Sequence, residues 1–417
     1  MRTSLLSTGE EILRGEVLDS NAAWAAETLD LRGFPLWRHL TCGDDLEEIR
    51  SPMAAGLEQA EALIVCGGLG PTVDDRTAEA LAGLLGVELQ ESPEARRTLE
   101  ARFAHMGVEL NPNQLRQARL PQGAQSLPNA KGTAPGIAAM TAEGKPIFCL
   151  PGPPHEYQAM LSEQVLPRLE AVRRAEGASC GQAYRVLKVF GMGEGAVAEA
   201  LGDLEAEVPG LLLGFRAALP EIHVKLRMEC PQQAQANTGL QRATELVRQR
   251  LGDRIFSEDG RSLAEVVVAE LRAQDHNLAL AESCTGGLVA KTLTDVPGAS
   301  AVFLLSAVTY ANEAKQKILG VPESLLAKHG AVSAQCAEAM AEGLRRISGA
   351  DLALSITGIA GPDGGSPEKP VGTVFFGICD AKGCRSHHRL FPLRERFMVR
   401  AIASHMALEL IRRSLRP

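Results

Sequence analysis

The sequence lacks the long apolar runs that would place part of the chain in a membrane. Its longest apolar stretch, around residues 301–308, is far shorter than the ~20 residues that a membrane-spanning helix needs. The start, MRTSLLSTGEEILRG, also lacks the apolar segment of a secretory signal. We therefore expect a cytoplasmic protein with no membrane partner.

An excess of positive charge is absent as well. The chain has 43 Lys and Arg residues against 51 Asp and Glu residues, which gives a formal net charge of −8. This balance provides no long-range attraction for a polyanion, and nucleic-acid binding normally needs clustered Lys and Arg. The composition therefore argues against DNA or RNA as a partner, unless a local basic patch exists.

The nine cysteines show no pairing pattern. They are scattered along the chain, without a C-x-x-C pair or the spacing of zinc ligands. Thiols stay reduced in the cytosol, so we expect free cysteines throughout. Internal repeats, heptads and low-complexity tracts are also missing.

What is present is the composition of a globular protein. The chain has 417 residues, of which 45% are hydrophobic and 23% charged. At ~100–200 residues per domain, this length predicts two to four domains. We expect three, which span residues 1–170, 181–256 and 257–417.

The first range alternates short apolar runs with amphipathic stretches, a pattern typical of a parallel α/β sheet. Helix signals support this interpretation, since Asp19 or Ser20 can cap the first helix and Gly33 can end it. We expect strands at 3–6, 34–40, 62–66 and 146–150, and helices at 21–31, 45–60, 75–85, 93–105 and 155–169.

Two further modules follow a predicted linker. Residues 170–181 are charged and rich in small side chains, which is typical of a connection between domains. The next segment predicts a small α+β module, and the last predicts an α/β domain whose first strand runs into ESCTGG. The expected strands are 185–190, 211–215, 221–228, 278–281 and 371–380, and the expected helices are 194–201, 234–251, 263–273 and one from Arg394.

Glycine and proline gather in loops that follow the predicted strands of the first range. An open α/β sheet places its ligand crevice at such strand ends. Gly67, Gly68 and Gly70 would let backbone N–H groups approach an anion, and the next helix adds its positive N-terminus. The pattern predicts a phosphate-binding site, although a GGLG segment alone is a common turn.

Carboxylates stand beside these glycines and would repel a phosphate unless a cation lay between them. We therefore predict a divalent metal with oxygen ligands, and Lys131 and Arg76 are candidates for direct positive charge. The simpler alternative is helix capping, which suits Asp44–Asp45 and Asp74–Asp75 equally well. The carboxylates are Glu10, Asp44, Asp45, Asp74, Asp75 and Glu156.

The stretch LALAESCTGGLVAKTL places Ser283 at a predicted turn between a strand and a helix. Gly286 and Gly287 would begin that helix and offer free N–H groups to an oxyanion. No histidine lies nearby in sequence, so the best base is Lys315, five residues after Tyr310 on a probable helix. A lysine of lowered pKa, helped by a tyrosine hydroxyl, can activate a serine.

Two further segments suit substrate binding in this domain. The loop SITGIAGPDGG offers Thr357 and several amides, while Arg396 and Arg400 on the last helix are candidate phosphate ligands. Structural alternatives remain open: Ser283 as a helix cap, and Lys315 as a solvated lysine. Cys284 is the more reactive neighbour, but a free cysteine is most often a buried hydrophobe. The pair His387–His388 resembles a metal site, but neighbours on a strand face opposite ways.

With these residues in view, the chain resembles the competence/damage-inducible protein A (CinA) family along nearly its whole length. The matching motifs are STGEEILRG, DSN, GGLGPTVDD, NAKGTAPG, PGPPHE, AESCTGG, VPGAS, VTYANEAK, GAVS, TGIAGPDGG and KPVGTV. The resemblance implies a first domain like the molybdopterin-binding domain, a middle module of KH type and a C-terminal α/β deamidase domain. The middle module lacks a clear GXXG loop, so we expect a connector or dimerisation module and a homodimer.

The resemblance also implies two activities. The C-terminal domain is similar to nicotinamide mononucleotide deamidases, with Ser283 as nucleophile, Lys315 as base and Tyr310 as its helper, and it needs no cofactor. The first domain is associated in the family with hydrolysis of ADP-ribose to AMP and ribose 5-phosphate, dependent on Mg²⁺, Mn²⁺ or Co²⁺, with K⁺ as a further candidate. The alternatives are a pterin- or nucleotide-binding module without turnover and a competence or DNA-repair scaffold.

The predicted site residues follow from the motifs and the resemblance together. For the C-terminal substrate they are Gly286, Gly287, Thr357, Gly358, Arg396 and Arg400. For the N-terminal substrate they are Glu10, Asn21, Gly67, Gly68, Gly70, Thr72, Lys131, Pro151 and Gly152, with Asp44, Asp74, Asp75 and Glu156 as metal ligands.

Two departures from the family pattern affect these assignments. PGPPHEY has Pro154 and Tyr157 where the family favours PGVPSEM, which leaves the role of His155 open. The segment from Phe391 to Arg400 is one residue longer than in stand-alone deamidases, so Arg396 and Arg400 are equal candidates. No Nudix box is present, so a pyrophosphatase here needs a different arrangement of carboxylates.

Overall fold

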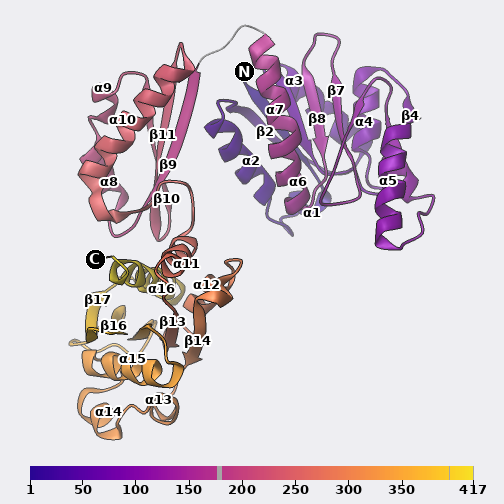
Figure 1. The fold of residues 1–417 in the computed structure, drawn as a ribbon. Helices are drawn as coiled ribbons and strands as arrows, with labels where there is room; N and C mark the ends of the chain where they lie inside the picture. Colours follow the sequence, from indigo (N-terminus) through magenta and orange to yellow (C-terminus); the bar gives the residue numbers. More distant parts are fainter. Residues whose placement is uncertain (176–180, 394, 417) are drawn as a thin grey trace. The chain divides into compact units, whose positions relative to one another are not determined.

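The computed structural model describes residues 1–175, 181–393 and 395–416. The chain divides into two compact units, residues 1–184 with 227–237 and residues 185–226 with 238–417. Each of the three predicted ranges contributes most of one larger sheet (Figure 1). The division into three domains stays a prediction.

The first sheet has the strand order β2-β1-β3-β8-β7-β6. Four strands are parallel: β1 (Thr3–Thr8), β2 (Leu36–Cys42), β3 (Ala62–Cys66) and β8 (Pro146–Leu150). The predicted parallel sheet is thus confirmed for these strands. Two antiparallel strands that the pattern did not predict, β7 (Gly136–Met140) and β6 (Gln125–Leu127), extend one edge.

Helices bury the two faces of this sheet in separate cores. On one face the core includes Ile49 of α3, Leu81 of α4 and Leu99 of α5; on the other it includes Leu29 of α2 and Leu166 of α7. The bounds are α1 Glu10–Leu13, α2 Ser20–Leu31, α3 Leu46–Leu57, α4 Thr77–Leu85, α5 Pro93–Met106, α6 Pro154–Met160, the π-helical η2 Leu161–Val165 and α7 Leu166–Ala175. Shorter elements are β4 Leu89–Glu91, η1 Gln114–Ala118 and β5 Arg119–Pro121.

The predicted linker is wrong in its first half. Helix α7 continues to Ala175, and in this extension the Arg173 guanidinium lies over the Phe34 ring. Residues 176–180 of the predicted linker lie outside the described residues.

The middle sheet has the order β10-β11-β9-β12 and is covered by helices. Its strands are β9 (Gly181–Val189), β10 (Leu211–Ala218), β11 (Glu221–Cys230) and β12 (Ile255–Ser257), and its helices are α8 (Glu194–Leu201), α9 (Leu204–Glu207) and α10 (Gln233–Leu251). The predicted α+β module is confirmed. The short strand β12 escaped prediction because a three-residue strand carries too few positions to show an alternating pattern.

The C-terminal sheet has the order β14-β13-β15-β16-β17. Strands β14 (Phe303–Val308), β13 (Leu278–Glu282) and β15 (Leu352–Gly358) are parallel, while β16 (Thr373–Asp380) and β17 (Gly383–Leu390) are antiparallel. The helices are α11 Leu263–Ala273, α12 Leu288–Thr294, α13 Asn312–Leu319, α14 Glu323–His329, α15 Ala334–Ser348 and α16 Arg396–Ser414. Arg394, where the last helix was predicted to begin, lies outside the described residues.

Helices α11, α12 and α16 pack on one face of this sheet, and α13, α14 and α15 on the other. The ends of β13 and β15 meet at one edge, because these two parallel strands are direct neighbours. Ser283 and Thr357 therefore lie at the same edge.

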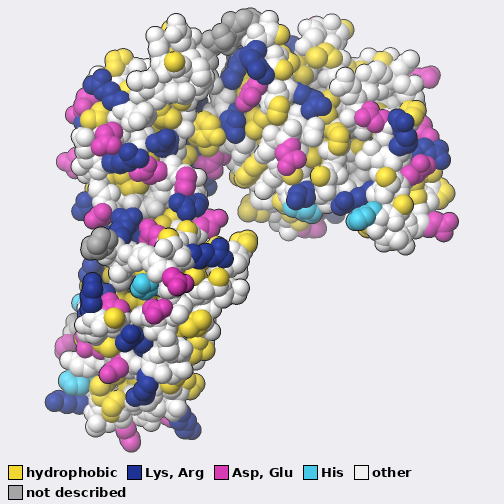
Figure 2. Space-filling model, viewed as in Figure 1, with side chains coloured by type: hydrophobic (Ala, Val, Ile, Leu, Met, Phe, Trp, Pro, Cys, Tyr) yellow, Lys and Arg dark blue, Asp and Glu magenta, His cyan; other side chains and the backbone are white. Residues whose placement is uncertain are grey.

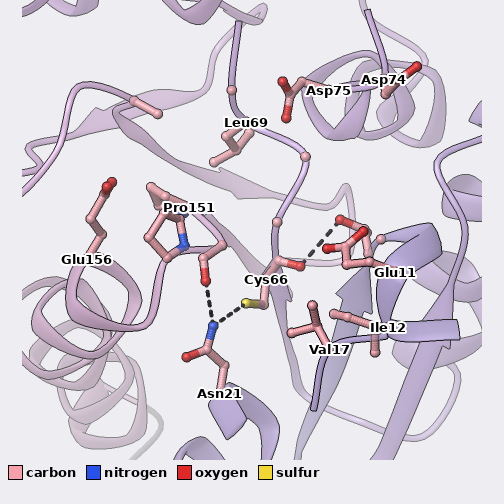
Figure 3. Close-up of a pocket in the computed structure, with 18 of the residues that line it drawn as sticks. Glu11, Ile12, Val17, Asn21, Cys66, Leu69, Asp74, Asp75, Pro151 and Glu156 are labelled. Atoms are coloured by element: carbon pink, nitrogen blue, oxygen red, sulfur yellow. Dashed lines mark hydrogen bonds between the residues drawn. The ribbon is translucent and has the colours of Figure 1, made fainter. Parts of the chain in front are cut away.

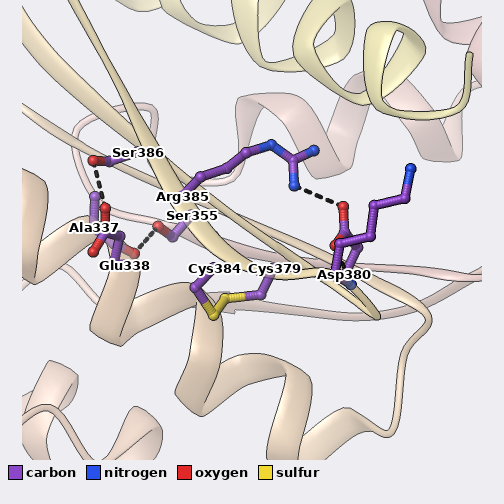
Figure 4. The surroundings of a disulfide bond; sticks show 9 residues. Ala337, Glu338, Ser355, Cys379, Asp380, Cys384, Arg385 and Ser386 are labelled. Carbon is purple, nitrogen blue, oxygen red and sulfur yellow. Dashed lines mark hydrogen bonds and ion pairs between the residues drawn. A yellow bond between two sulfur atoms is a disulfide. The ribbon is translucent and has the colours of Figure 1, made fainter. Parts of the chain in front are cut away.

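A disulfide corrects the expectation that every cysteine is reduced. Cys379 on β16 and Cys384 on β17 face each other in the hairpin and are bonded (Figure 4). They are five positions apart in the sequence, a spacing that only the hairpin pairing turns into a contact. Among the other described cysteines, Cys42, Cys66, Cys149, Cys284 and Cys336 are free. In the same region Ser355 donates to the Ala337 carbonyl and Ser386 to Glu338, which ties α15 to the sheet.

Among the described helices, none combines the length and apolarity that crossing a bilayer requires. On the face drawn in Figure 2, basic and acidic side chains are interspersed rather than gathered by sign.

Helix α15 approaches α13 so closely that only glycine fits at one position. A Cβ on Gly343 would lie 1.8 Å from the Leu319 carbonyl oxygen at the end of α13. We predict that Gly343→Ala lowers the free energy of unfolding by about 1–3 kcal/mol, because the backbone of α13 must move. Gly195→Ala on α8 is the control, since a Cβ there meets no atom within 4 Å. Urea unfolding of both variants checks this, and equal midpoints would show that the close approach costs nothing.

Candidate active sites

A cavity of about 550 Å³ opens at the strand ends of the first sheet (Figure 3). The loops after β1, β3 and β8 line it, as expected for an open α/β sheet. The predicted residues that line it are Asn21, Asp44, Gly67, Gly68, Gly70, Thr72, Asp74, Asp75, Pro151, Gly152 and Glu156.

Two predicted residues do not line this cavity. Glu10 pairs with Arg14 instead, and its backbone N–H donates to Asp44. Its neighbour Glu11 faces the cavity, because successive residues at the start of a helix point in different directions. Lys131 is exposed and lies outside the lining. The candidate Arg76 pairs with Glu79 and Asp45.

The lining is acidic throughout. Its ionisable side chains are Glu11, Asp19, Asp44, Asp74, Asp75 and Glu156, together with the thiol of Cys66, and no Lys, Arg or His is among the described residues that line it. A phosphate can therefore approach only on backbone N–H groups or together with a cation.

The four predicted metal ligands do not form a preformed cluster. Within the described ranges, no group of three or more His, Cys, Asp or Glu residues is arranged to hold a metal ion. Asp75 accepts hydrogen bonds from the amide and hydroxyl of Thr72, and Glu156 accepts one from Asn129. Asp44 accepts from the Glu10 amide, and burial raises the pKa of its carboxyl.

The capping alternative holds for only one of the acidic pairs. Asp45 accepts from the Glu47 amide and caps α3. Asp74 and Asp75 do not cap α4, whose N-cap residue is Arg76. Asp75 holds the turn at Thr72 instead.

The glycine loop after β3 needs its glycines for steric reasons. Gly67 and Gly68 have φ values of 105° and 66°, which favour glycine. A Cβ on Gly68 would lie 2.2 Å from the hydroxyl of Thr77, which itself donates to the Gly67 carbonyl. The backbone of this loop therefore packs closely against Thr77.

Polar atoms beneath the cavity are left without partners. The amide nitrogen of Asn21 donates to the Gly152 carbonyl and to Cys66, at 2.7 and 3.2 Å (Figure 3). Its carbonyl oxygen is buried and has no hydrogen-bond partner within the described part of the chain, and the same is true of the Tyr157 hydroxyl. Burial raises the pKa of Tyr157 well above its ordinary value. His155 is mostly exposed and lies near Glu156.

In the C-terminal domain, the nucleophile and base candidates meet. The Lys315 ammonium nitrogen lies 3.1 Å from the Ser283 hydroxyl, 2.8 Å from the Thr309 carbonyl and 3.2 Å from the Tyr310 carbonyl. Both side chains are buried, which excludes the solvated-lysine alternative. Burial lowers the pKa of Lys315. A neutral amine would donate to the two carbonyls and keep its lone pair for the serine hydroxyl.

The prediction for Tyr310 is wrong in its geometry. Tyr310 precedes α13, which begins at Asn312, and its side chain is 60% exposed. Its hydroxyl accepts a hydrogen bond from Arg396 at 2.8 Å, while only its backbone carbonyl contacts Lys315. The chain reverses before the helix, so the two side chains do not share a helix face.

The helix-start amides are not free for an oxyanion, which corrects the prediction for Gly286 and Gly287. The carboxylate of Glu282 is fully buried and accepts from the amides of Gly287, Val289 and Ala290, at 2.9, 3.2 and 2.9 Å. The Gly286 amide donates to the Ser283 carbonyl. Sequence reasoning missed Glu282, although an acidic residue just before a glycine-rich helix start is the available signal.

Both candidate arginines reach this edge of the sheet. Arg400 donates to the Thr285 carbonyl at 2.7 Å, two residues after the nucleophile candidate. Arg396 bridges the Tyr310 hydroxyl and the Gly361 carbonyl. The Thr357 hydroxyl donates to the Ala331 carbonyl, and Gly358 ends β15 beside it.

Burial and geometry exclude three remaining alternatives: Cys284 as the nucleophile, Ser283 as a helix cap and His387–His388 as a metal site. Cys284 is buried, which raises the pKa of its thiol to about 11 and keeps it protonated. Ser283 accepts no helix-capping bond, since Gly287 is the N-cap residue of α12. His388 stacks on Phe375, and no metal-binding group forms there in the described chain.

The fold and the two sites define a multidomain α/β protein with one enzyme-like site in each terminal domain. Three family descriptions match in sequence: a probable molybdopterin binding domain at residues 4–171, the KH domain of damage-inducible protein CinA at 184–257 and the CinA C-terminal domain at 260–415. CinA-like proteins of Geotalea uraniireducens and Citrifermentans bemidjiense are 43% and 45% identical to this chain, and each alignment covers 100% of the chain and 98% of the relative. The chain therefore belongs to the CinA family.

Solved structures also match part of the chain. One is the competence/damage inducible protein CihA from Agrobacterium tumefaciens, which is 40% identical over 37% of this chain and 93% of that chain, with a TM-score of 0.36.

The buried carboxylate of Glu282 generates a stability prediction. Glu282→Ala leaves the three amides at the start of α12 without an acceptor, so we expect the free energy of unfolding to fall by about 3 kcal/mol. Glu282→Gln keeps one acceptor oxygen and should lose less. Urea unfolding, with hydrogen exchange at residues 287–290, measures both effects. An alanine variant within about 0.5 kcal/mol of the wild type would contradict this role.

Proposed function

We propose that the C-terminal domain deamidates nicotinamide mononucleotide to nicotinic acid mononucleotide and ammonia. The contact between Lys315 and Ser283 carries this proposal, because a buried lysine of lowered pKa beside a serine hydroxyl is a base and nucleophile pair. Positive charge from Arg396 and Arg400 at the same edge suits the phosphate of the mononucleotide.

In this mechanism the serine oxygen attacks the carboxamide carbon while its proton passes to the lysine nitrogen. The protonated lysine and Arg400 then stabilise the developing oxyanion, since Glu282 occupies the amides of α12. The lysine returns the proton to the amide nitrogen, and ammonia leaves an acyl-enzyme. Water hydrolyses the ester, releases the carboxylate product and restores Ser283.

We expect Ser283→Ala to reduce ammonia release from nicotinamide mononucleotide by about 1000-fold or more, because it removes the hydroxyl that lies beside Lys315. Cys284→Ala is the matched control and should retain most of the activity, because the pKa of its buried thiol is about 11. Full activity in Ser283→Ala would refute the nucleophile.

The same assay run across pH tests the base. Ammonia release should rise with pH as Lys315 loses its proton, with a midpoint below the ordinary pKa of lysine because burial lowers it. Lys315→Met should be inactive at every pH. A wild-type profile that is flat, or that falls as pH rises through this range, would contradict a lysine base.

For the N-terminal domain we propose hydrolysis of ADP-ribose to AMP and ribose 5-phosphate. Water would attack one phosphorus of the pyrophosphate, and the bridging oxygen would leave on the other phosphate. The acidic cavity supports a divalent cation, Mg²⁺, Mn²⁺ or Co²⁺ with K⁺ as a further candidate, that enters with the substrate. Asp44 and Asp74 would hold it together with phosphate oxygens, and it would supply charge neutralisation.

The absence of a carboxylate cluster in the described chain favours a second candidate for this domain. A pterin- or nucleotide-binding module without turnover needs no preformed metal site. Equilibrium binding of ADP-ribose without release of AMP would support it. A homodimer formed through the connector module and a cytoplasmic location are further proposals.

We expect EDTA to abolish AMP release from ADP-ribose and excess Mg²⁺ to restore it. Asp74→Asn should reduce the rate about 100-fold, since its carboxylate makes no hydrogen bond or ion pair with the described residues and is free for a cation. Asp45→Asn is the control, because it lies outside the cavity and asparagine also caps helices. AMP release that is indifferent to EDTA would refute metal dependence.

A further inference from the structure

A second cavity, of about 270 Å³, lies beside the first across the glycine loop of the N-terminal domain. The two cavities share lining residues from this loop, namely Gly68, Leu69 and Gly70, together with Asp75 and Gln117. A ligand whose middle rests on the loop can therefore extend into both.

Of the two cavities, only the second has positively charged side chains among its described lining residues. Arg116 of η1 and Arg119 of β5 line it, whereas the first cavity has no cationic side chain among its described residues. Neither arginine forms an ion pair or side-chain hydrogen bond within the described ranges. The two acidic side chains of the second cavity are already engaged, Asp75 by Thr72 and Glu79 by Arg76.

Gln117 connects the two cavities. Its amide nitrogen donates to the Leu69 carbonyl of the glycine loop, at 3.4 Å. Its carbonyl oxygen is buried and has no partner in the part of the chain that is described. A buried acceptor without a donor costs free energy unless a ligand hydroxyl or N–H group binds it.

The linings of the two cavities differ in chemistry as well as in size. The larger one presents the apolar side chains of Ile12, Val17 and Leu18, which suit the flat face of a nucleobase. The smaller one offers two guanidinium groups and an amide oxygen, which suit a phosphate next to a sugar hydroxyl.

We propose that the second cavity is a sugar-phosphate subsite, in which Arg116 and Arg119 bind the phosphate and Gln117 accepts a ribose hydroxyl. The nucleoside half then occupies the larger cavity, and the pyrophosphate crosses the glycine loop, so that its ribose-side phosphate is the one that the two arginines bind. The inference rests on the proposed ADP-ribose hydrolysis. Of its two products, AMP would bind in the larger cavity and ribose 5-phosphate in the smaller one.

Calorimetric titration of the full-length protein with ribose 5-phosphate and, separately, with AMP tests this subsite. For the Arg116→Gln/Arg119→Gln double variant we expect at least tenfold weaker binding of ribose 5-phosphate, with AMP affinity within twofold of the wild type. Arg50→Gln/Arg97→Gln is the matched control, because it removes the same charge from the same domain outside both cavities.

Three outcomes would overturn the proposal. They are unchanged ribose 5-phosphate affinity in the double variant, an equal loss for both ligands, and wild-type protein that does not bind ribose 5-phosphate at millimolar concentration. Hydrolysis is measured separately. If the wild type releases no AMP from ADP-ribose but binds both products with this dependence on the arginines, the hydrolase proposal fails while the subsite stands.

Discussion

The C-terminal site depends on one interaction at the end of β13. There the Glu282 carboxylate accepts hydrogen bonds from three backbone amides, those of Gly287, Val289 and Ala290. A buried carboxylate needs such partners, and the first turn of a helix supplies amides that have no acceptor of their own. The Glu282 carbonyl also accepts from the Thr309 amide, and the Thr309 carbonyl in turn holds Lys315. One residue therefore positions both the serine turn and the loop that presents the lysine.

The N-terminal site is governed by charge. A cavity lined by carboxylates and glycines cannot bind a phosphate group by side-chain charge, so the proposed substrate would depend on backbone amides, a cation and the two arginines of the adjacent cavity. Both sites lie at strand ends of α/β sheets, where the loops are free to vary while the strands stay buried. The family descriptions match the two terminal domains separately.

The fold was largely predictable from local patterns. Strands β3 and β8 and helices α8 and α11 begin and end where the apolar patterns predict. The two strands are apolar runs that are buried on both faces, and the two helices bury side chains at helical spacing. The antiparallel strands β6 and β7 were missed, since their residues are few and only partly buried. The extension of α7 and the Cys379–Cys384 bond were also missed, because both depend on contacts with neighbouring elements.

The sequence by itself determined which short motifs carry chemistry: the serine turn, the lysine after it and the glycine loop, whose residue types and order are local properties. Tertiary structure alone decided which side chains share a site. The side chain of Glu11, rather than that of Glu10, lines the first cavity, and Lys131 lies outside it. The predicted metal ligands line the cavity without forming a metal-binding group among the described residues. In the folded protein the Tyr310 hydroxyl also accepts a hydrogen bond from Arg396, and the Glu282 carboxylate accepts the hydrogen bonds of the α12 amides. The physical reason is that the direction of a side chain and the partners of a backbone amide are set by packing, which no single segment contains.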